Sequence, residues 1–349
     1  MDALTHAIVG AAIAQLPRSS GLNKQSSISW RKRAIIGASA ALFPDIDYLL
    51  FLINPLDFIA YWHRAETHSL LLAPLWAWLI MQCWQRFTSW QLPTKQLYWL
   101  CFLAITSHPL LDSLTTFGTQ WFAPISRYRF AFNVLFVIDV YFSVIALCSL
   151  LLLIIVNHQI VKILALLLPA CYLLVVFNIK HNIEQSLSGN QQTITLLPQP
   201  FSLLYWQAIS QTEHGFVQTY IKLGSDPIAQ WVSSKFGLPQ QASYQLSEQL
   251  TWQHYNTLPS GPIMNNHALQ VWQHPKFKAF HQFSAYPIFY DYQHTPQHTC
   301  VWFSDLRYHW PNVIPSFRYG MCRKNQTNHS NEWHLYRMKY FSEQAVTAN

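Results

Sequence analysis

Long apolar segments in the first half of the chain constrain its fold more than any other feature. They cover residues 4–16, 34–53, 69–85, 97–114, 134–156 and 160–179. An α-helix rises about 1.5 Å per residue, so a run of about 20 apolar residues can cross a hydrocarbon core of about 30 Å. We therefore expect a membrane α-helical bundle of about six apolar helices.

The second half of the chain has a different character. The whole sequence is 51% hydrophobic and only 11% charged, whereas soluble proteins average about 25% charged residues. After residue 180, however, Gln, His, Tyr and Trp are frequent, and short runs of β-branched and aromatic residues predict strands at 193–197, 202–209, 216–223, 300–308, 317–321 and 333–340. The region 226–280 is consistent with helix. We expect two domains, a membrane-embedded helical domain at 1–180 and a β-rich soluble domain at 181–349.

Charge and cysteine spacing exclude several classes of function. The net charge is +7, but no dense Lys/Arg stripe occurs outside residues 31–33, so we expect no nucleic-acid partner. No Cys-x-x-Cys pair is present, which excludes a zinc finger or a thioredoxin-type motif. Cys300 and Cys322 lie in the polar half and are either a disulfide or two free thiols.

Ionisable side chains enter the apolar half at a small number of motifs. These are Thr5-His6, Pro44-Asp45-Ile46-Asp47, His63-Arg64-Ala65-Glu66-Thr67-His68-Ser69, His108 with Asp112, and Asp139. Ionisable groups inside a membrane are costly and mark functional sites. If each segment crosses the bilayer, the direction of the chain alternates, and all of these motifs then fall at one depth on one membrane face.

Lys and Arg in the short loops predict which face this is. The loops on the opposite face carry most of the basic residues, including the run 31–33, and short basic loops stay in the cytoplasm. We therefore expect a multi-pass protein of the plasma membrane whose polar motifs face outward. With six crossings, the 181–349 domain is extracytoplasmic as well.

Histidine and carboxylate side chains together form the ligand set of zinc, with manganese and iron as alternatives. His108 and Asp112 are four residues apart, which places them on one face of a helix. Alone, such a pair also fits a local hydrogen bond, but the motifs together favour a metal centre. The expected ligands are His6, Asp47, His63, His68, His108 and Asp112.

Other charged residues in the motifs are assigned supporting roles. Asp45, Glu66 and Asp139 are candidates for a bridging ligand, a general base or a carboxylate that orients a histidine. Arg64, together with Arg127 or Arg129, is a candidate for holding an anionic substrate group.

The stretches MDALTHAIVG, FPDIDYL, HRAETHSLL and HPLLDSLTTFGTQWFAPIS resemble, in this order, the YdjM/YfhP-type family of bacterial inner-membrane proteins. The resemblance runs through residues 1–140, and its motifs fall on Thr5-His6, 44–47, 63–69 and 108–119. It implies a metal-dependent hydrolase of the bacterial inner membrane. The order of ligands is also distantly similar, in spacing alone, to zinc-dependent phospholipase C and the S1/P1 nucleases.

These observations favour a hydrolase that acts at the lipid–water boundary. A metal-activated water would attack a phosphoester or other ester of a lipid-linked or amphipathic substrate. Two alternatives are a non-enzymatic membrane protein with a metal or proton site for transport, and a structural or regulatory membrane protein with a partner-binding outer domain. Substrate, number of metal ions and oligomeric state are open at this point.

Overall fold

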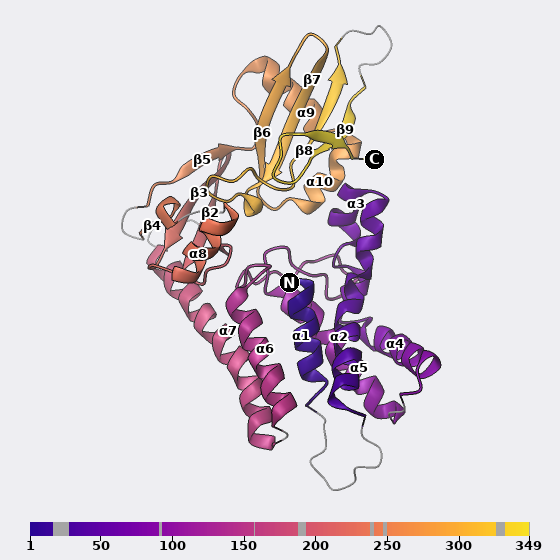
Figure 1. Ribbon diagram of the computed structural model, residues 1–349. Coiled ribbons are helices and arrows are strands. Elements are labelled where there is room, and N and C mark those ends of the chain that lie inside the picture. Colours follow the sequence, from indigo (N-terminus) through magenta and orange to yellow (C-terminus); the bar gives the residue numbers. More distant parts are fainter. Residues whose placement is uncertain are drawn as a thin grey trace. The chain divides into compact units, whose positions relative to one another are not determined.

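The computed structural model describes residues 1–16, 28–90, 93–156, 158–187, 193–237, 241–246, 250–325 and 332–348 (Figure 1). The chain divides into two compact units. The first, here called the helical unit, comprises Met1–Tyr48 and Arg64–Asn182. The second, the β-rich unit, comprises Leu49–His63 and Ile183–Asn349. The expected domains met at residue 180, and the contacts in the structure group residues 49–63 with the second unit.

The helical unit contains α1 (Ala3–Ile13), α2 (Trp30–Leu42), η4 (Glu66–His68), α4 (Ala73–Phe87), α5 (Thr94–Ser113), α6 (Val140–Ile155) and most of α7 (Gln159–Leu187). The 3-10 helix η2 (Phe43–Leu52) follows α2 directly and begins at Phe43, just before Pro44. Proline has no N–H to continue an α-helix and fixes its own φ angle, which accounts for the change of winding.

α1 and α2 cross at very close range because their contact is made by small residues. A Cβ atom on Gly10 would lie 2.4 Å from the Gly37 carbonyl oxygen, and one on Gly37 would lie 2.2 Å from the Gly10 oxygen. Close approach through glycine and alanine is typical of helix pairs in membranes. The same two helices pack against α5, so the crossing brings the start of α1 and the end of α2 to the histidine-bearing part of α5.

Two helical stretches among the described residues are long and apolar enough to cross a membrane, namely Trp30–Leu52 and Gln159–Leu187. The expectation of about six such helices is therefore wrong. α1 and α6 are apolar but have only 11 and 16 residues, which corresponds to about 16 and 24 Å. α4 has 15 residues, and α5 has 20 but carries Lys95, His108 and Asp112.

The β-rich unit confirms the expected β-rich second half and contains two five-stranded sheets. In the first, β1 (Ile194–Pro198), β2 (Tyr205–Thr212) and β3 (Gly215–Lys222) are antiparallel neighbours, and β4 (Gln245–Leu246) and β5 (Gln253–Asn256) both pair with β3. The second is an antiparallel array of β6 (Pro287–His294), β7 (His298–Asp305), β8 (Tyr319–Lys324), β9 (His334–Met338) and β10 (Ala345–Thr347).

Buried aromatic and aliphatic side chains join the parts of the β-rich unit. Ile209 and Phe216 of the first sheet share a core cluster with Ile288 of the second. α9 (Pro262–Trp272) and α10 (Lys278–Phe283) cover β7, since Trp272 lies 5.1 Å from Phe303 between ring centroids. The expected helix within 226–280 is present as α8 (Pro227–Phe236) and α9.

Two further features complete this unit. α3 (Pro55–Asp57) and the π-helical turn η3 (Phe58–Trp62) pack against α10, which explains why residues 49–63 group with this half of the chain. Cys300 of β7 and Cys322 of β8 are cross-strand neighbours and form a disulfide. The question that the sequence left open is therefore answered in favour of the pair.

Candidate metal centre in the helical unit

Four separate elements of the helical unit bring histidine and carboxylate side chains together. His6 lies on α1, Asp45 on η2, His68 at the end of η4, and His108 and Asp112 on α5. They form two overlapping groups, His6 with His108 and Asp112, and Asp45 with His68 and His108. His68 ends a 3-10 turn and precedes α4.

The side chains of His68 and His108 face each other. Their Nε2 atoms are 3.1 Å apart, and Asp45 Oδ1 lies 3.6 Å from the first and 3.5 Å from the second. Asp112 Oδ2 lies 3.5 Å from His68 Nε2 and 3.2 Å from His108 Nε2. Both histidines and Asp112 are fully buried, while the Asp45 side chain is 22% exposed. Asp45 is thus the carboxylate of this cluster with the greatest access from outside.

Hydrogen bonds on the far sides of the two rings orient them. His108 Nδ1 lies 2.6 Å from the backbone oxygen of Ala41 at the end of α2. Because a carbonyl oxygen can only accept, Nδ1 carries the proton, and the Nε2 lone pair of a neutral ring is directed into the cluster. His68 Nδ1 lies 3.0 Å from Thr67 Oγ1 and 3.5 Å from Asp47 Oδ2.

Asp45 and Asp47 therefore lie on opposite sides of the His68 ring. Asp45 faces Nε2 and the cluster, whereas Asp47 faces Nδ1 and also accepts a hydrogen bond from the backbone N–H of Arg64. The sequence motifs predicted Asp47 as a ligand and Asp45 as a supporting carboxylate. The geometry gives Asp47 the orienting position and Asp45 the inner one.

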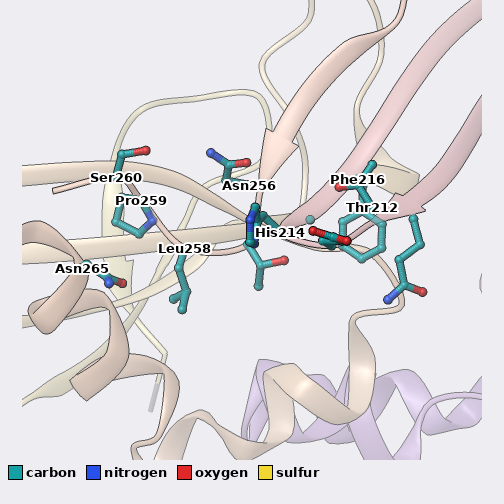
Figure 2. Close-up of a pocket in the computed structure, with 12 residues that line it drawn as sticks. Thr212, His214, Phe216, Asn256, Leu258, Pro259, Ser260 and Asn265 are labelled. Atoms are coloured by element: carbon teal, nitrogen blue, oxygen red, sulfur yellow. The ribbon is translucent and has the colours of Figure 1, made fainter.

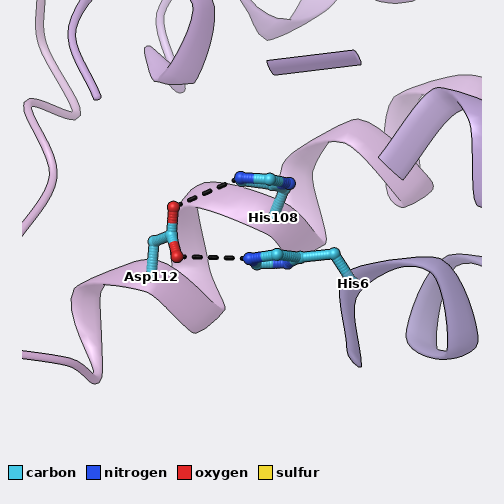
Figure 3. A group of neighbouring side chains, drawn as sticks. All are labelled: His6, His108 and Asp112. Atoms are coloured by element: carbon cyan, nitrogen blue, oxygen red, sulfur yellow. Dashed lines mark hydrogen bonds and ion pairs between the residues drawn. The ribbon is translucent and has the colours of Figure 1, made fainter. Parts of the chain in front are cut away.

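His6 adds a third imidazole at Asp112. Its Nε2 lies 3.2 Å from Asp112 Oδ1, and its ring stacks on that of His108 with centroids 3.5 Å apart (Figure 3). The Met1 amino group also contacts Asp112 Oδ1. In contrast, neither Asp112 Oδ2 nor His6 Nδ1 has a hydrogen-bond partner among the described residues.

Arg64 holds Asp112 in place and does not project as a free anion clamp. Its guanidinium lies 2.9 Å from Asp112 Oδ1, and it donates to the Asp112 carbonyl and to Thr115 Oγ1. The residue has a φ of 57°, a left-handed conformation that non-glycine residues adopt rarely and that is often found at functional sites. The side chain is buried, so its role here is to position a carboxylate.

Three other predicted site residues are engaged elsewhere. Glu66 forms an ion pair with Arg127 at 2.8 Å. Asp139 caps α6 through the Phe142 N–H and accepts hydrogen bonds from Tyr172 of α7, which joins these two helices (Figure 1). His63 packs its ring on Phe58 at 4.8 Å. Neither of the two metal-ligand groups found among the described residues contains any of the three.

The arrangement fits a divalent cation. Zinc binds imidazole nitrogen at about 2.0–2.1 Å, so the donors around a tetrahedral ion lie about 3.3 Å apart. The two Nε2 atoms are 3.1 Å apart. Each of them lies between 3.2 and 3.6 Å from Asp45 Oδ1 and from Asp112 Oδ2. Two facing Nε2 acceptors repel unless a proton or a cation lies between them. Burial lowers the pKa of His68 to about 4, which favours its neutral, ligating form, whereas the carboxylates of Asp112 and Asp45 outweigh burial and raise the pKa of His108.

The comparison with known families bears on the same residues. The YdjM inner membrane protein family matches residues 1–183, which is more than half of the chain. The chain belongs to the YdjM inner membrane protein family. This confirms the resemblance seen in the sequence motifs, and it identifies the chain as an inner membrane protein. No curated protein and no solved structure matches it.

The YdjM match contains every residue of the two metal-ligand groups and also covers supporting atoms that the motifs did not predict. The Ala41 carbonyl, which fixes the His108 ring, has no side-chain signal in a sequence. Thr67 and Thr115 stand within the recognised motifs, but their contacts to His68 and Arg64 depend on the tertiary structure.

The part of the chain that follows the YdjM match has a pocket of its own. It encloses about 500 Å³ at the β2–β3 turn, between residues 211–216 and 256–260 (Figure 2). His214 and Glu213 contribute ionisable groups to its lining, while Thr212, Asn256 and Ser260 contribute neutral polar ones. The two metal-ligand groups of the described residues both lie in the helical unit, so the chemistry of this pocket differs from that of the His/Asp cluster.

Proposed function

We propose that this YdjM-family protein is a membrane-bound, metal-dependent hydrolase. Its substrate would be a phosphoester or other ester of a lipid-linked or amphipathic molecule. The observation that carries the proposal is the pair of facing imidazole nitrogens, 3.1 Å apart and flanked by two carboxylates. Facing acceptor atoms in a largely buried cluster are costly unless a cation completes it.

The residues divide into holding and orienting roles. The two overlapping groups, Asp45 with His68 and His108 and His6 with His108 and Asp112, would hold a divalent metal, zinc or alternatively manganese or iron. Such an ion, when bound, lowers the pKa of a water molecule and polarises the ester or phosphoryl oxygen. Asp47 and the Ala41 carbonyl keep the two imidazole rings in the ligating tautomer.

The chain's own groups also support the handling of protons. Asp45 is the most exposed carboxylate of the cluster, so it is best placed to accept a proton from an incoming water. Arg64 holds Asp112 through its Oδ1 atom and neutralises part of the buried negative charge. Arg129, which lies over the Phe117 ring at 4.8 Å, remains a candidate for contact with an anionic group.

We further propose that the protein crosses the membrane several times, with the cluster and the β-rich unit on the extracytoplasmic side. The basic run 31–33 at the start of the Trp30–Leu52 stretch supports an outward-facing cluster. The Cys300–Cys322 disulfide independently supports an extracytoplasmic β-rich unit, since such bonds persist in oxidising compartments. A reporter that works only in the cytoplasm, fused after Asn349, is expected to be silent, and strong activity would refute this orientation.

The central test is the metal content of the detergent-purified full chain, measured together with a screen of phosphoester and lipid-ester substrates. We expect bound metal and hydrolysis, both lost in His108→Ala. The matched control is His158→Ala, an exposed histidine of the same half that lies outside the cluster. Protein that holds no metal, even after incubation with zinc, manganese or iron(II), would overturn the metal centre. Bound metal without hydrolysis would overturn the hydrolase and favour transport.

A further inference from the structure

An apolar groove of about 280 Å³ lies beside the His/Asp cluster within the helical unit. Its walls come from α1, α5, α6 and α7. The lining side chains are almost all hydrocarbon, and several are small: Ala12, Ala146, Ser149, Ala165 and Ala170. A groove with this lining does not offer water the polar partners that it needs.

Along α1 and α5, the groove-lining residues begin close to the residues of the His/Asp cluster. Val9 of the lining stands three residues after His6 on α1, which is about one helical turn. On α5, the lining residue Leu111 directly precedes Asp112, and Ser107 directly precedes His108. One end of a molecule lying in the groove would therefore be within about one helical turn of the positions that carry the histidines and Asp112 on α1 and α5.

The size of the groove indicates what it can hold. Its lining runs from Phe142 to Leu153 on α6, a length of about 16 Å. This is about half of a 30 Å hydrocarbon core, which is the depth of one lipid leaflet. With its side chains, a helix from a second copy would be about 10–12 Å across, as wide as the helices that wall the groove. A single hydrocarbon chain is narrow enough.

We propose that this groove binds one hydrocarbon chain of a lipid whose polar group lies at the His/Asp cluster. The inference rests on the proposed function and deepens it, because it makes the substrate a membrane lipid with a chain of its own. The chain-binding residues are those of α6 and α7 that face the groove, above all Ala146, Ser149 and Ala170. Their small side chains leave the space that the hydrocarbon occupies.

The test uses the full chain in detergent and a phospholipid that carries a photoactivatable diazirine near the end of one acyl chain. After illumination, labelled peptides are mapped by mass spectrometry. We expect labelling to concentrate on the groove-lining parts of α6 and α7, and to decrease when unlabelled phospholipid is added. Ala170→Trp should reduce it about tenfold, because the indole fills the groove. Cys171→Trp, at an exposed neighbouring position outside the lining, should leave it unchanged.

Ser149→Leu, on the opposite wall, gives a second filling variant in case Ala170→Trp fails to fold. Labelling spread evenly over outward-facing residues such as Leu147 and Leu151 would show ordinary bilayer contact and overturn the inference. So would equal labelling of Ala170→Trp and Cys171→Trp. Metal content is measured on the same samples. If the protein hydrolyses its substrate but the filling variants leave the labelling unchanged, only the groove proposal is refuted. If the groove is labelled but the protein has neither metal nor hydrolysis, only the proposed function is refuted.

Discussion

Each unit of this protein buries a carboxylate completely, but the two are satisfied in different ways. In the β-rich unit, Asp305 accepts hydrogen bonds on both oxygens from the Arg307 side chain and from the N–H groups of Ala285 and Arg307. In the helical unit, Asp112 Oδ1 has Arg64 and His6, but Oδ2 faces the Nε2 atoms of two histidines whose rings are oriented from their other side.

This difference indicates that Asp305 is a structural charge and that Asp112 is a candidate metal ligand. Burial acts to raise the pKa of the Asp305 carboxyl, but the guanidinium of Arg307 and its hydrogen bonds outweigh burial and hold the pKa below its usual range. That site is complete within the protein. Asp112 Oδ2 has acceptors around it and no hydrogen-bond donor among the described residues, so its surroundings become favourable when a cation is bound.

The largest expected effect is at Asp112. Asp112→Asn removes the negative charge that faces His68 and His108, and we expect bound metal to fall from about one ion per chain to background. Asp139→Asn is the matched control, since Asp139 is also buried in the helical unit but is held by Tyr172 and the α6 terminus. Elemental analysis of the purified proteins measures this. Equal metal content in both variants would remove Asp112 from the site.

The next effect concerns the stability of the β-rich unit. Asp305→Ala leaves the buried Arg307 guanidinium without its partner and should destabilise this unit by about 3–5 kcal/mol. Hydrogen exchange of peptides from β7 reports the change locally. Replacing both partners, with Asp305→Leu and Arg307→Met, should recover most of the loss, because no unpaired charge remains. If Asp305→Ala is as stable as the unchanged protein, this ion pair is not needed for stability.

The sequence predicts a large part of the His/Asp cluster and of the two sheets, for reasons that can be traced to particular residues. The motifs that carry His6, His68, His108 and Asp112 were expected to lie at one depth, and the structure brings these four residues together, although the expected number of crossing segments was wrong. The β-branched and aromatic runs likewise predict six of the strands. Both inferences depend on periodicity and spacing, which sequences record directly.

Other features depend on tertiary contacts or on backbone winding. Which of Asp45 and Asp47 faces the cluster is decided by the 3-10 winding of η2, which has about three residues per turn instead of 3.6. The number of crossing helices was overestimated because short apolar helices such as α1 and α6 resemble spans in composition while lacking length. The grouping of residues 49–63 with the β-rich unit follows from packing on α10, which no local pattern indicates.

A third prediction concerns His309, a buried histidine of the β-rich unit, whose Nε2 lies 2.7 Å from Ser304 Oγ. Burial lowers its pKa to about 4, below the ordinary 6.5 of an unfolded chain. The unfolded state therefore binds more protons between these values. The contribution of neutral His309 to the free energy of unfolding is complete above pH 6.5. It is lost as the pH falls towards 4, by roughly 3 kcal/mol.

Hydrogen exchange of β7 peptides between pH 7 and pH 4, corrected for the intrinsic exchange rate, measures this loss. His309→Gln removes the titrating ring and should flatten that part of the pH dependence. An identical slope in the variant would assign the acid sensitivity to other groups. This histidine provides the counterpart to His68, which is also buried but whose Nε2 faces a second imidazole instead of a hydroxyl group.

The smallest expected effect distinguishes the two aspartates of η2. Asp47 orients His68 from its Nδ1 side and does not face the cluster. Removing a carboxylate in such a position typically weakens metal binding about 10–100-fold. Asp47→Asn should therefore still bind metal, with an affinity reduced by about this factor in a competition titration with a chelator. Asp45→Asn, which alters the inner carboxylate, should lose more. If Asp47→Asn instead abolishes binding as completely as Asp112→Asn, Asp47 is itself a ligand. The cluster would then rearrange around the ion, because Asp47 Oδ2 now lies on the far side of the His68 ring from Nε2.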